Sequence, residues 1–276
     1  MSVDMEIICV GNELLIGKVV NTNASWLGKR ATSLGVSVKR ITVVADDVKE
    51  MASLFCEVIA RKPKFIVSTG GLGPTFDDKT LEGIAKALNR KLSVNQDALN
   101  MVRAKYKEYA RSRGIHGDEL TAPKTKMAVL PEGAQPIQNP VGTAPGVRFD
   151  IGETVLVVLP GVPREMEAIF EKVVAPMLRQ ATGGAGFFEL SIYADNIMES
   201  VLAPLIDVVM GDNPLVYIKS HPKGRENKPH MELHLSTSGK PSKNPQERLS
   251  KAALELSGLI EKAGGEVVKI DTEIMV

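Results

Sequence analysis

The sequence is short of the features that mark secreted, membrane-spanning or nucleic-acid-coating proteins. Its two cysteines, Cys9 and Cys56, form no Cys-x-x-Cys pair, so we expect two buried thiols in a reducing compartment. No apolar run approaches the roughly 20 residues that a membrane helix requires. A strand follows the N-terminus directly, so we expect no signal peptide and a cytoplasmic location. A net charge of +1 argues against a general nucleic-acid surface.

Several common catalytic motifs are also missing. There is no Gly-x-Ser-x-Gly nucleophile elbow and no zinc-ligand spacing, which argues against the usual serine hydrolases and zinc enzymes. Residues 164–167 look like part of a Nudix diphosphate-hydrolase box, but its paired glutamates and its upstream glycine and glutamate are absent. Residues 187–272 lack the Gly-x-x-Gly loop with which KH domains clamp nucleic-acid backbone, so we expect no nucleic-acid partner.

The first 180 residues alternate between apolar runs and helical patterns, which is typical of an α/β domain. The order predicts a mostly parallel sheet with helices on both faces, and ligands beyond the carboxyl ends of its strands. A loop region rich in proline and glycine is expected over 114–146, before a hairpin through 147–149. The predicted strands are 6–10, 36–44, 65–67 and 154–159, and the predicted helices are 24–34, 48–59, 78–88, 95–113 and 164–178.

The pattern changes after a glycine-rich stretch at 181–186, which we interpret as a linker. The following order of strand, helix, two strands, helix and strand predicts a ferredoxin-like split α+β unit. We therefore expect two domains, a nucleotide- or phosphate-binding domain over 1–180 and a small α+β domain over 187–272. The predicted elements of the second are 187–194, 197–210, 215–219, 231–235, 245–263 and 266–270.

The loop from Ser68 to Asp78 carries the clearest signal for a binding site. Three glycines in four residues let backbone amides approach an anion, and the next helix directs its positive end at the same place. The loop is neither a Walker loop nor a dinucleotide-binding Gly-x-Gly-x-x-Gly. The alternative is a tight turn that needs glycine for steric reasons. The candidate phosphate-binding residues are Thr69, Gly70, Gly71, Gly73, Pro74 and Thr75.

Asp77 and Asp78 sit at the end of this loop, where we expect the next helix to begin. Capping a helix needs one carboxylate, whereas two beside a phosphate repel it unless a divalent cation lies between them. We therefore predict that Asp78, with Asp77 beside it, holds a metal ion.

Other loops at the same edge of the sheet are suited to hydrogen-bonding a base, a ribose or a pterin. Asn23 or Ser25 alternatively caps a helix, and Asp46 either binds a ribose hydroxyl or shapes its turn. Two proline- and glycine-rich loops follow later and are by themselves simple turns. The candidate ligand-binding residues in these loops are Gly11, Glu13, Gly17, Asn21, Thr22, Asn23, Asn139, Gly142, Thr143, Gly161 and Pro163.

Polar side chains also appear in the second domain. His230, Glu232 and His234 alternate with apolar residues and share one face of a predicted strand. We interpret this as an exposed strand face in preference to a metal site. The polar segment from Lys219 to Gly224 could reach an anion, which makes Lys219 a candidate binding residue.

Together these motifs resemble the amino-terminal domain of the competence/damage-inducible protein A (CinA) family. The resemblance rests on Gly11–Leu15 with Gly17 and Asn21–Asn23, on Thr69–Thr75 with Asp77 and Asp78, on Asn139 with Gly142–Gly146, and on Leu159–Pro163 with Glu165 and Met166. It implies a molybdopterin-binding-like (MoCF) fold for residues 1–180 and a KH-like domain after it. We also expect a homodimer.

The resemblance further implies hydrolysis of the pyrophosphate bond of ADP-ribose or a related compound such as FAD. The family chemistry uses a divalent metal, Mg²⁺ or Co²⁺, assisted by K⁺. By position, Asp78 and Asp77 match the metal and catalytic carboxylates, Gly70–Thr75 the phosphate loop, and Asp46 a further aspartate of the site. Lys79, Lys18 or Lys219 would neutralise developing charge.

The sequence also departs from many bacterial members, which have threonine at Asn12 and glutamine at Lys18. Because the chain ends at Val276, we expect no nicotinamide-mononucleotide deamidase activity. Two other functions remain open. One is a molybdopterin-binding protein of molybdenum-cofactor biosynthesis, and the other is a non-catalytic nucleotide-binding module.

Overall fold

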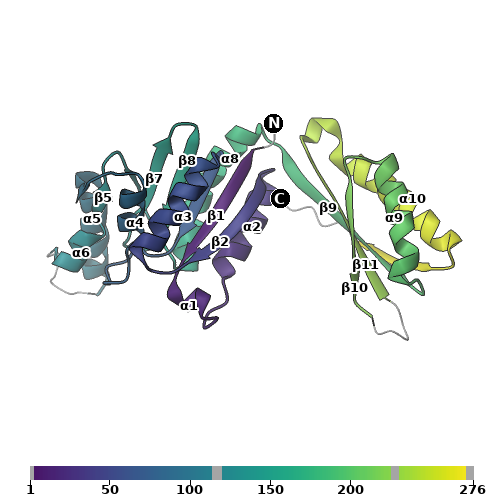
Figure 1. The fold of residues 1–276 in the computed structure, drawn as a ribbon, viewed down its shortest axis with the longest axis horizontal. Coiled ribbons are helices and arrows are strands. Elements are labelled where there is room, and N and C mark those ends of the chain that lie inside the picture. The colour runs from purple at the N-terminus through teal and green to yellow at the C-terminus, as the bar shows by residue number, and fades with distance from the viewer. Residues whose placement is uncertain (1–2, 114–119, 225–229, 272–276) are drawn as a thin grey trace. The chain divides into compact units, whose positions relative to one another are not determined.

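The computed structural model describes residues 3–113, 120–224 and 230–271, which form two compact units. The first unit comprises the described part of residues 1–31 and 36–178, and the second that of residues 32–35 and 179–276. Figure 1 shows the two units with their elements labelled. Among the described residues, no helix combines the length and apolar character needed to cross a bilayer.

A six-stranded sheet forms the centre of the first unit. The strand order is β2-β1-β3-β8-β7-β6; the first four strands are parallel, while β7 is antiparallel to both of its neighbours. The mostly parallel sheet predicted from the sequence is therefore confirmed. The strands are β1 (Asp4–Val10), β2 (Ser37–Val44), β3 (Phe65–Thr69), β6 (Gln135–Ile137), β7 (Gly146–Ile151) and β8 (Thr154–Leu159).

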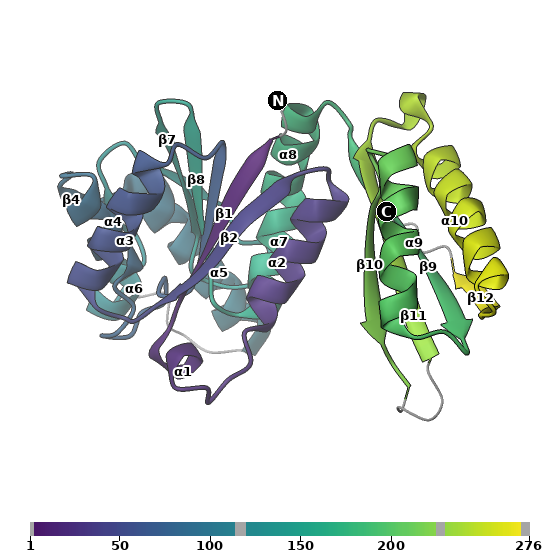
Figure 2. The ribbon, with the colours of Figure 1, turned by 45° about the vertical axis from the view of Figure 1, so that its right-hand side comes forward.

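Helices cover both faces of this sheet (Figure 2). Helices α3 and α4 lie on one face, where Phe55 and Ile84 join a buried core with Ile66 of β3. Helices α2, α7 and α8 lie on the other face, where the Trp26 and Phe170 rings meet edge to face at 5.2 Å. The helices are α2 (Thr22–Ser33), α3 (Val48–Ala60), α4 (Thr80–Ala87), α5 (Gln96–Arg113), α7 (Pro163–Ile169) and α8 (Ala175–Thr182), with a π-helical turn over Phe170–Val174 between the last two.

The strand order creates a crevice where the chain reverses direction across the sheet. From β1 the chain passes outward to β2 and then returns to the other side of β1 to form β3. The loops after β1 and β3 therefore leave neighbouring strands, whose last paired residues are Cys9 and Thr69. Open α/β sheets bind ligands at such a switch point. The fold thus brings the two most distinctive sequence motifs to one place.

The second unit is a four-stranded antiparallel sheet with α9 and α10 on one face (Figure 1). Its element order, strand-helix-strand-strand-helix-strand, is the one predicted from the sequence. Buried Leu233 and Leu235 of β11 pack with Leu256 and Ile260 of α10. The KH-like relationship stays a prediction. The elements are β9 (Gly186–Asp195), α9 (Glu199–Asp212), β10 (Tyr217–Pro222), β11 (His230–Gly239), α10 (Pro245–Lys262) and β12 (Glu266–Asp271).

His230, Glu232 and His234 do share one face of β11, but the face is half-buried and not fully exposed. Both imidazoles contact carboxylates of β9. His230 Nδ1 lies 2.5 Å from Asp195 Oδ1, and His234 Nε2 lies 3.0 Å from Glu189 Oε2. Each histidine of this face therefore pairs with a carboxylate of β9.

Three local predictions were wrong. The expected loop over 114–146 contains, in its described part, helix α6 (Ala122–Lys126) and strands β5 (Val129–Pro131) and β6. Strand β5 pairs with the short β4 (Leu92–Val94), which the sequence also did not reveal. Cys56 of α3 is exposed, and its Sγ donates to the carbonyl of Ala87 at the end of α4 at 3.5 Å. Cys9 is buried as expected.

The contact between α3 and α4 generates a test of the fold. A Cβ on Gly83 would lie 2.7 Å from Met51 Cβ, so Gly83→Ala must push the two helices apart. We expect a loss of about 1–3 kcal/mol in the free energy of unfolding. The matched control is Gly28→Ala in α2, whose Cβ would meet nothing closer than 3.7 Å. That variant should gain about 0.5–1 kcal/mol, because alanine is the better helix former. Denaturant titrations followed by circular dichroism measure both; equal effects would contradict the packing described.

Candidate functional site

The glycine loop after β3 is pressed against the end of β1. Gly70 has a φ of +106°, and a Cβ there would lie 2.3 Å from the Val10 carbonyl oxygen. Gly71 has a φ of +66°, and a Cβ there would lie 2.2 Å from Thr80 Oγ1. Both positions therefore require glycine for packing within the protein itself. The steric alternative raised by the sequence accounts for these two glycines without a ligand.

Hydroxyl and amide side chains fix the loop in place. Thr80 Oγ1 donates to the Gly70 carbonyl at 2.8 Å, and Thr69 Oγ1 donates to the Pro160 carbonyl at 2.8 Å. The Asn23 amide donates to Thr69 Oγ1 at 3.2 Å and to the Gly161 carbonyl at 2.8 Å. Asn23 and Thr69 thus tie the loop after β8 to the ends of α2 and β3, and they act as positioning residues.

The centre of the loop presents unpaired backbone donors. Among the described residues, none accepts a hydrogen bond from the N–H groups of Gly71, Leu72 and Gly73. Buried backbone donors nearly always find a partner in the protein, in water or in a ligand. Gly71–Gly73 thus offer three successive amides without a described partner next to the amino end of α4, where the anion-binding role of the loop stays a prediction.

Asp77 and Asp78 form a turn before α4, and not the first turn of the helix as predicted. Helix α4 begins at Thr80, and its first position receives no side-chain cap. The Thr75 hydroxyl lies within hydrogen-bond distance of both carboxylates, at 2.5 Å from Asp78 Oδ2, and Thr75 N donates to the same oxygen at 2.8 Å. The hydrogen bond from Thr75 lowers the pKa of Asp77. The two carboxylates are therefore held side by side.

Asp46, at the end of β2, is clamped to the loop after β1. Asn12 N donates to Asp46 Oδ2 at 2.8 Å, and Asp46 N donates to Asn12 Oδ1 at 3.3 Å. Burial raises the pKa of Asp46, and the carboxylates of Glu13, Asp77 and Asp78 raise it further. Asp46 thus shapes its turn, as one of the two sequence interpretations held, and also belongs to a cluster of like charges.

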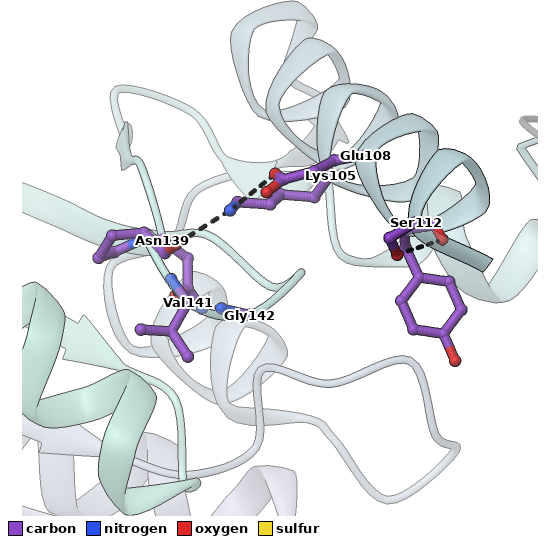
Figure 3. Close-up of polar contacts among 8 residues, drawn as sticks. Lys105, Glu108, Ser112, Asn139, Val141 and Gly142 are labelled. Carbon is purple, nitrogen blue, oxygen red and sulfur yellow. Dashed lines mark hydrogen bonds and ion pairs between the residues drawn. The ribbon is translucent and has the colours of Figure 1, made fainter.

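Asn139 organises the loop that closes the site on the β7 side (Figure 3). Its Oδ1 accepts from Val141 N at 3.0 Å and from Gly142 N at 2.8 Å. Its Nδ2 donates to the Ala144 carbonyl at 2.9 Å and to Glu165 Oε2 at 2.7 Å. On the other side, Lys105 of α5 reaches the Pro140 carbonyl at 3.0 Å. Asn139 is therefore a positioning residue for this loop and for Glu165.

These loops enclose a cavity of about 380 Å³, which we call the acidic cavity. Its described lining contains five carboxylates, those of Glu13, Asp46, Asp77, Asp78 and Glu165, and no lysine, arginine or histidine. Eleven of the predicted site residues meet here. They are Gly11, Glu13, Asp46, Gly70, Gly71, Gly73, Pro74, Asp77, Asp78, Thr143 and Gly161.

The remaining predicted residues lie outside the lining of this cavity. Lys219 lies on β10 of the second unit, and its binding role stays a prediction. Glu165 was missed as a site residue, although its place in the first turn of α7, after Pro160–Pro163, was a usable signal. The other predicted residues that do not line the cavity are Gly17, Asn21, Thr22, Asn23, Thr69, Thr75, Asn139, Gly142 and Pro163.

The donor set suits a hard divalent cation in part. Asp77 and Asp78 offer carboxylate oxygens, which Mg²⁺ prefers, and Mg²⁺ commonly takes its other ligands from water and substrate phosphates. Across the described ranges, no group of three or more histidine, cysteine, aspartate or glutamate side chains is arranged to hold a metal alone. The residues therefore fit an ion shared with a ligand, and they do not form a complete protein cage. The choice of Mg²⁺, Co²⁺ or K⁺ stays a prediction.

Comparisons with known proteins find relatives over most of the chain. Residues 6–180 match the family model described as "Probable molybdopterin binding domain". A protein of Pyrobaculum calidifontis is 47% identical over 256 residues, which cover 92% of this chain and 94% of that protein. A protein of Metallosphaera sedula is 42% identical over 266 residues, covering 96% and 97% respectively. The crystal structure of the protein CinA from Thermoplasma acidophilum is similar with a TM-score of 0.57 and 41% identity, over 63% of this chain and 98% of that one.

The raised pKa of Asp46 predicts that ionisation of this carboxyl group lowers the stability of the folded protein. The folded protein binds the Asp46 proton more tightly than the unfolded chain does, so stability is lost as pH rises through the interval between the two pKa values. Asp46→Asn keeps an oxygen acceptor for Asn12 N and removes the charge. With chelator present, the variant should melt roughly 1–3 °C above the wild type at pH 7. The difference should vanish below about pH 4, where both side chains are neutral. A difference that is independent of pH would refute this electrostatic account.

Proposed function

The chain belongs to the family described as "Probable molybdopterin binding domain", and on that premise we propose that the acidic cavity binds the phosphate group of a phosphorylated pterin or nucleotide. The observation that carries this proposal is that one cavity is lined by five carboxylates and by three residues whose amides have no partner among the described residues. Amides of this kind attract an anion, whereas the carboxylates repel it. The two are compatible when a cation accompanies the phosphate.

The proposed arrangement assigns separate roles to the two sides of the cavity. The amides of Gly71, Leu72 and Gly73 and the amino end of α4 would receive phosphate oxygens. Asp77 and Asp78 would hold the accompanying divalent cation, with Asp46 and Glu13 close enough to strengthen the local negative field. Mg²⁺ is commonly bound by one or two carboxylates together with substrate phosphates, and this coordination supports the separate roles of the amides and the carboxylates.

A second candidate function is hydrolysis of the pyrophosphate bond of ADP-ribose or FAD. The paired carboxylates of Asp77 and Asp78 beside free amides favour it, because this is the layout of metal-assisted phosphoryl transfer. A bound divalent ion supplies Lewis acidity and lowers the pKa of a water molecule. The amides would hold a non-bridging oxygen while Asp46, which is not assigned to the ion, would receive a proton from the attacking water. The water oxygen bonds to phosphorus, the bridging bond breaks, and the proton passes to the leaving phosphate, giving AMP and ribose 5-phosphate from ADP-ribose.

Binding is tested by calorimetry with inorganic pyrophosphate in the presence and absence of Mg²⁺. We expect binding to require Mg²⁺ and to weaken at least about tenfold in Asp78→Asn, which retains the oxygen that accepts from Thr75 but loses the charge. The control is Asp97→Asn, at an exposed position in the first turn of α5. Metal-independent binding, or equal affinity in Asp78→Asn and the wild type, would exclude the proposed site.

Hydrolysis is tested by product analysis of ADP-ribose and FAD with Mg²⁺, Mn²⁺ and Co²⁺. A hydrolase should release AMP from either compound, and Asp78→Asn should lower turnover by at least about 100-fold. If ADP-ribose binds tightly but no product forms with any of the three metals, the proposal of hydrolysis is wrong and the proposal of binding stands.

A further inference from the structure

Lys105 lies near the middle of α5, and only 19% of its side chain is exposed. Lysine side chains are mostly exposed in proteins, so this burial requires a reason. The ammonium group donates to the Pro140 carbonyl at 3.0 Å and to Glu108 Oε2 at 3.1 Å (Figure 3). None of the described residues that line the acidic cavity comes from α5. Any effect of Lys105 on that cavity must therefore pass through one of these two contacts.

The ion pair with Glu108 does not account for the placement of Lys105. The Glu108 side chain is 71% exposed and lies three residues further along the same helix, and surface pairs of this kind contribute little to stability. The bond to Pro140 is different, because it joins α5 to a loop that is 35 residues away in the chain. The role of the ammonium group is therefore to be sought in that loop.

A small cavity beside this bond separates part of the loop from α5. It has a volume of about 110 Å³. Met101, Ala104 and Lys105 line it from α5, and Asn139 and Thr143 line it from the loop. A gap of this kind forfeits the packing contacts that would otherwise hold the loop against the helix. The bond from Lys105 therefore carries more of the attachment than it would in a fully packed interface.

The same loop forms a wall of the acidic cavity. Thr143 lines both cavities. Asn139, which precedes Pro140, donates to Glu165 Oε2 at 2.7 Å and accepts from Gly142 N at 2.8 Å. A Cβ on Gly142 would overlap the Glu165 carboxylate, so the loop backbone and this carboxylate are in direct contact. A displacement of the loop at Pro140 is thereby passed on to Glu165.

From this series of contacts we infer that Lys105 is a positioning residue, which sets the place of Glu165 and Thr143 in the wall of the acidic cavity. It acts through the loop from Asn139 to Thr143 and contacts no ligand. The inference rests on the proposed function for its consequence, because Glu165 adds to the negative field that holds the cation in the proposed site. It deepens that function by placing control over one wall of the site in a helix outside it.

Amide NMR on the full chain tests the positioning step without any ligand. In Lys105→Met, which keeps an aliphatic stem but removes the donor, the signals of Val141, Gly142 and Glu165 should shift from their wild-type places. Lys105→Arg restores a donor and should return these signals toward the wild-type places. Unmoved signals in folded Lys105→Met would overturn the inference.

Two variants on the same helix serve as controls. Glu108→Gln removes the ion-pair partner of Lys105 and keeps the bond to Pro140. Arg111→Met removes a positive charge from an exposed position and so reports on the general field of α5. Both should leave the three signals in place. Shifts in either control equal to those in Lys105→Met would contradict a specific role for the bond to Pro140.

Calorimetry with Mg²⁺ and inorganic pyrophosphate tests the consequence for binding. Lys105→Met should weaken binding about three- to tenfold, whereas Lys105→Arg and both controls should change it less than about twofold. In a double-mutant cycle, Lys105→Met should change the affinity less than about twofold once Glu165→Gln has removed the carboxylate charge. A general loosening of the fold would act equally in both backgrounds, so an additive cycle overturns the inference.

The outcomes separate this inference from the proposed function. If pyrophosphate does not bind the wild type, the proposed phosphate site is wrong; shifted loop signals in Lys105→Met then support the positioning role, and unmoved signals overturn it. If pyrophosphate binds and folded Lys105→Met keeps full affinity, the phosphate site stands and the inference is wrong. Circular dichroism establishes that each variant is folded, and Lys105→Ala replaces Lys105→Met if the latter does not fold.

Discussion

The contact between the Gly70 backbone and the Val10 carbonyl sets the geometry on which the whole site depends. It exists because β1 and β3 are neighbours and end at the same level of the sheet, so the two loops must leave through the same small space. There is no room for a side chain at Gly70 or Gly71. The hydroxyl groups of Thr69 and Thr80 hold the backbone in place by donating to the carbonyls of Pro160 and Gly70. The consequence is a loop whose next three amides have no partner among the described residues. The availability of these amides is a by-product of how the strands pack.

The electrostatics of the site follow from the same crowding. Loops from four strand ends each contribute a carboxylate or a short polar side chain, and they converge without a cationic side chain among the described lining residues. Burying a carboxylate among like charges is costly: burial is the main cause of the raised pKa of Asp46, and the carboxylates of Glu13, Asp77 and Asp78 raise it further. Folded proteins tolerate such a cost at functional sites when a ligand or ion offsets it.

The sequence predicted the parts of this structure that depend on strong periodicity. The apolar run Glu6–Val10 predicted a strand, and the amphipathic pattern after Asp47 predicted a helix. Because the loops that follow parallel strands meet at one edge of the sheet, the location of the site followed from these elements. Short elements were missed because three-residue strands such as β4 and β5 carry almost no periodic signal. Helix α4 was predicted to begin at Asp78 but begins two residues later, at Thr80, since propensity does not reveal that Thr75 binds both carboxylates before the helix. The bond between Lys105 and the Pro140 carbonyl lay beyond the reach of the sequence, because α5 and the loop after β6 meet in three dimensions alone.

The central claim is that the amides after β3 are the anion-binding element, and amide NMR tests it most directly. A ¹⁵N-labelled sample titrated with Mg²⁺ and inorganic pyrophosphate should show its largest amide shifts at Gly71, Leu72 and Gly73. Smaller shifts are expected at Gly11, Thr143 and Gly161, which line the same cavity. Saturable shifts centred elsewhere, with the signals of Gly71–Gly73 unmoved, would contradict the account.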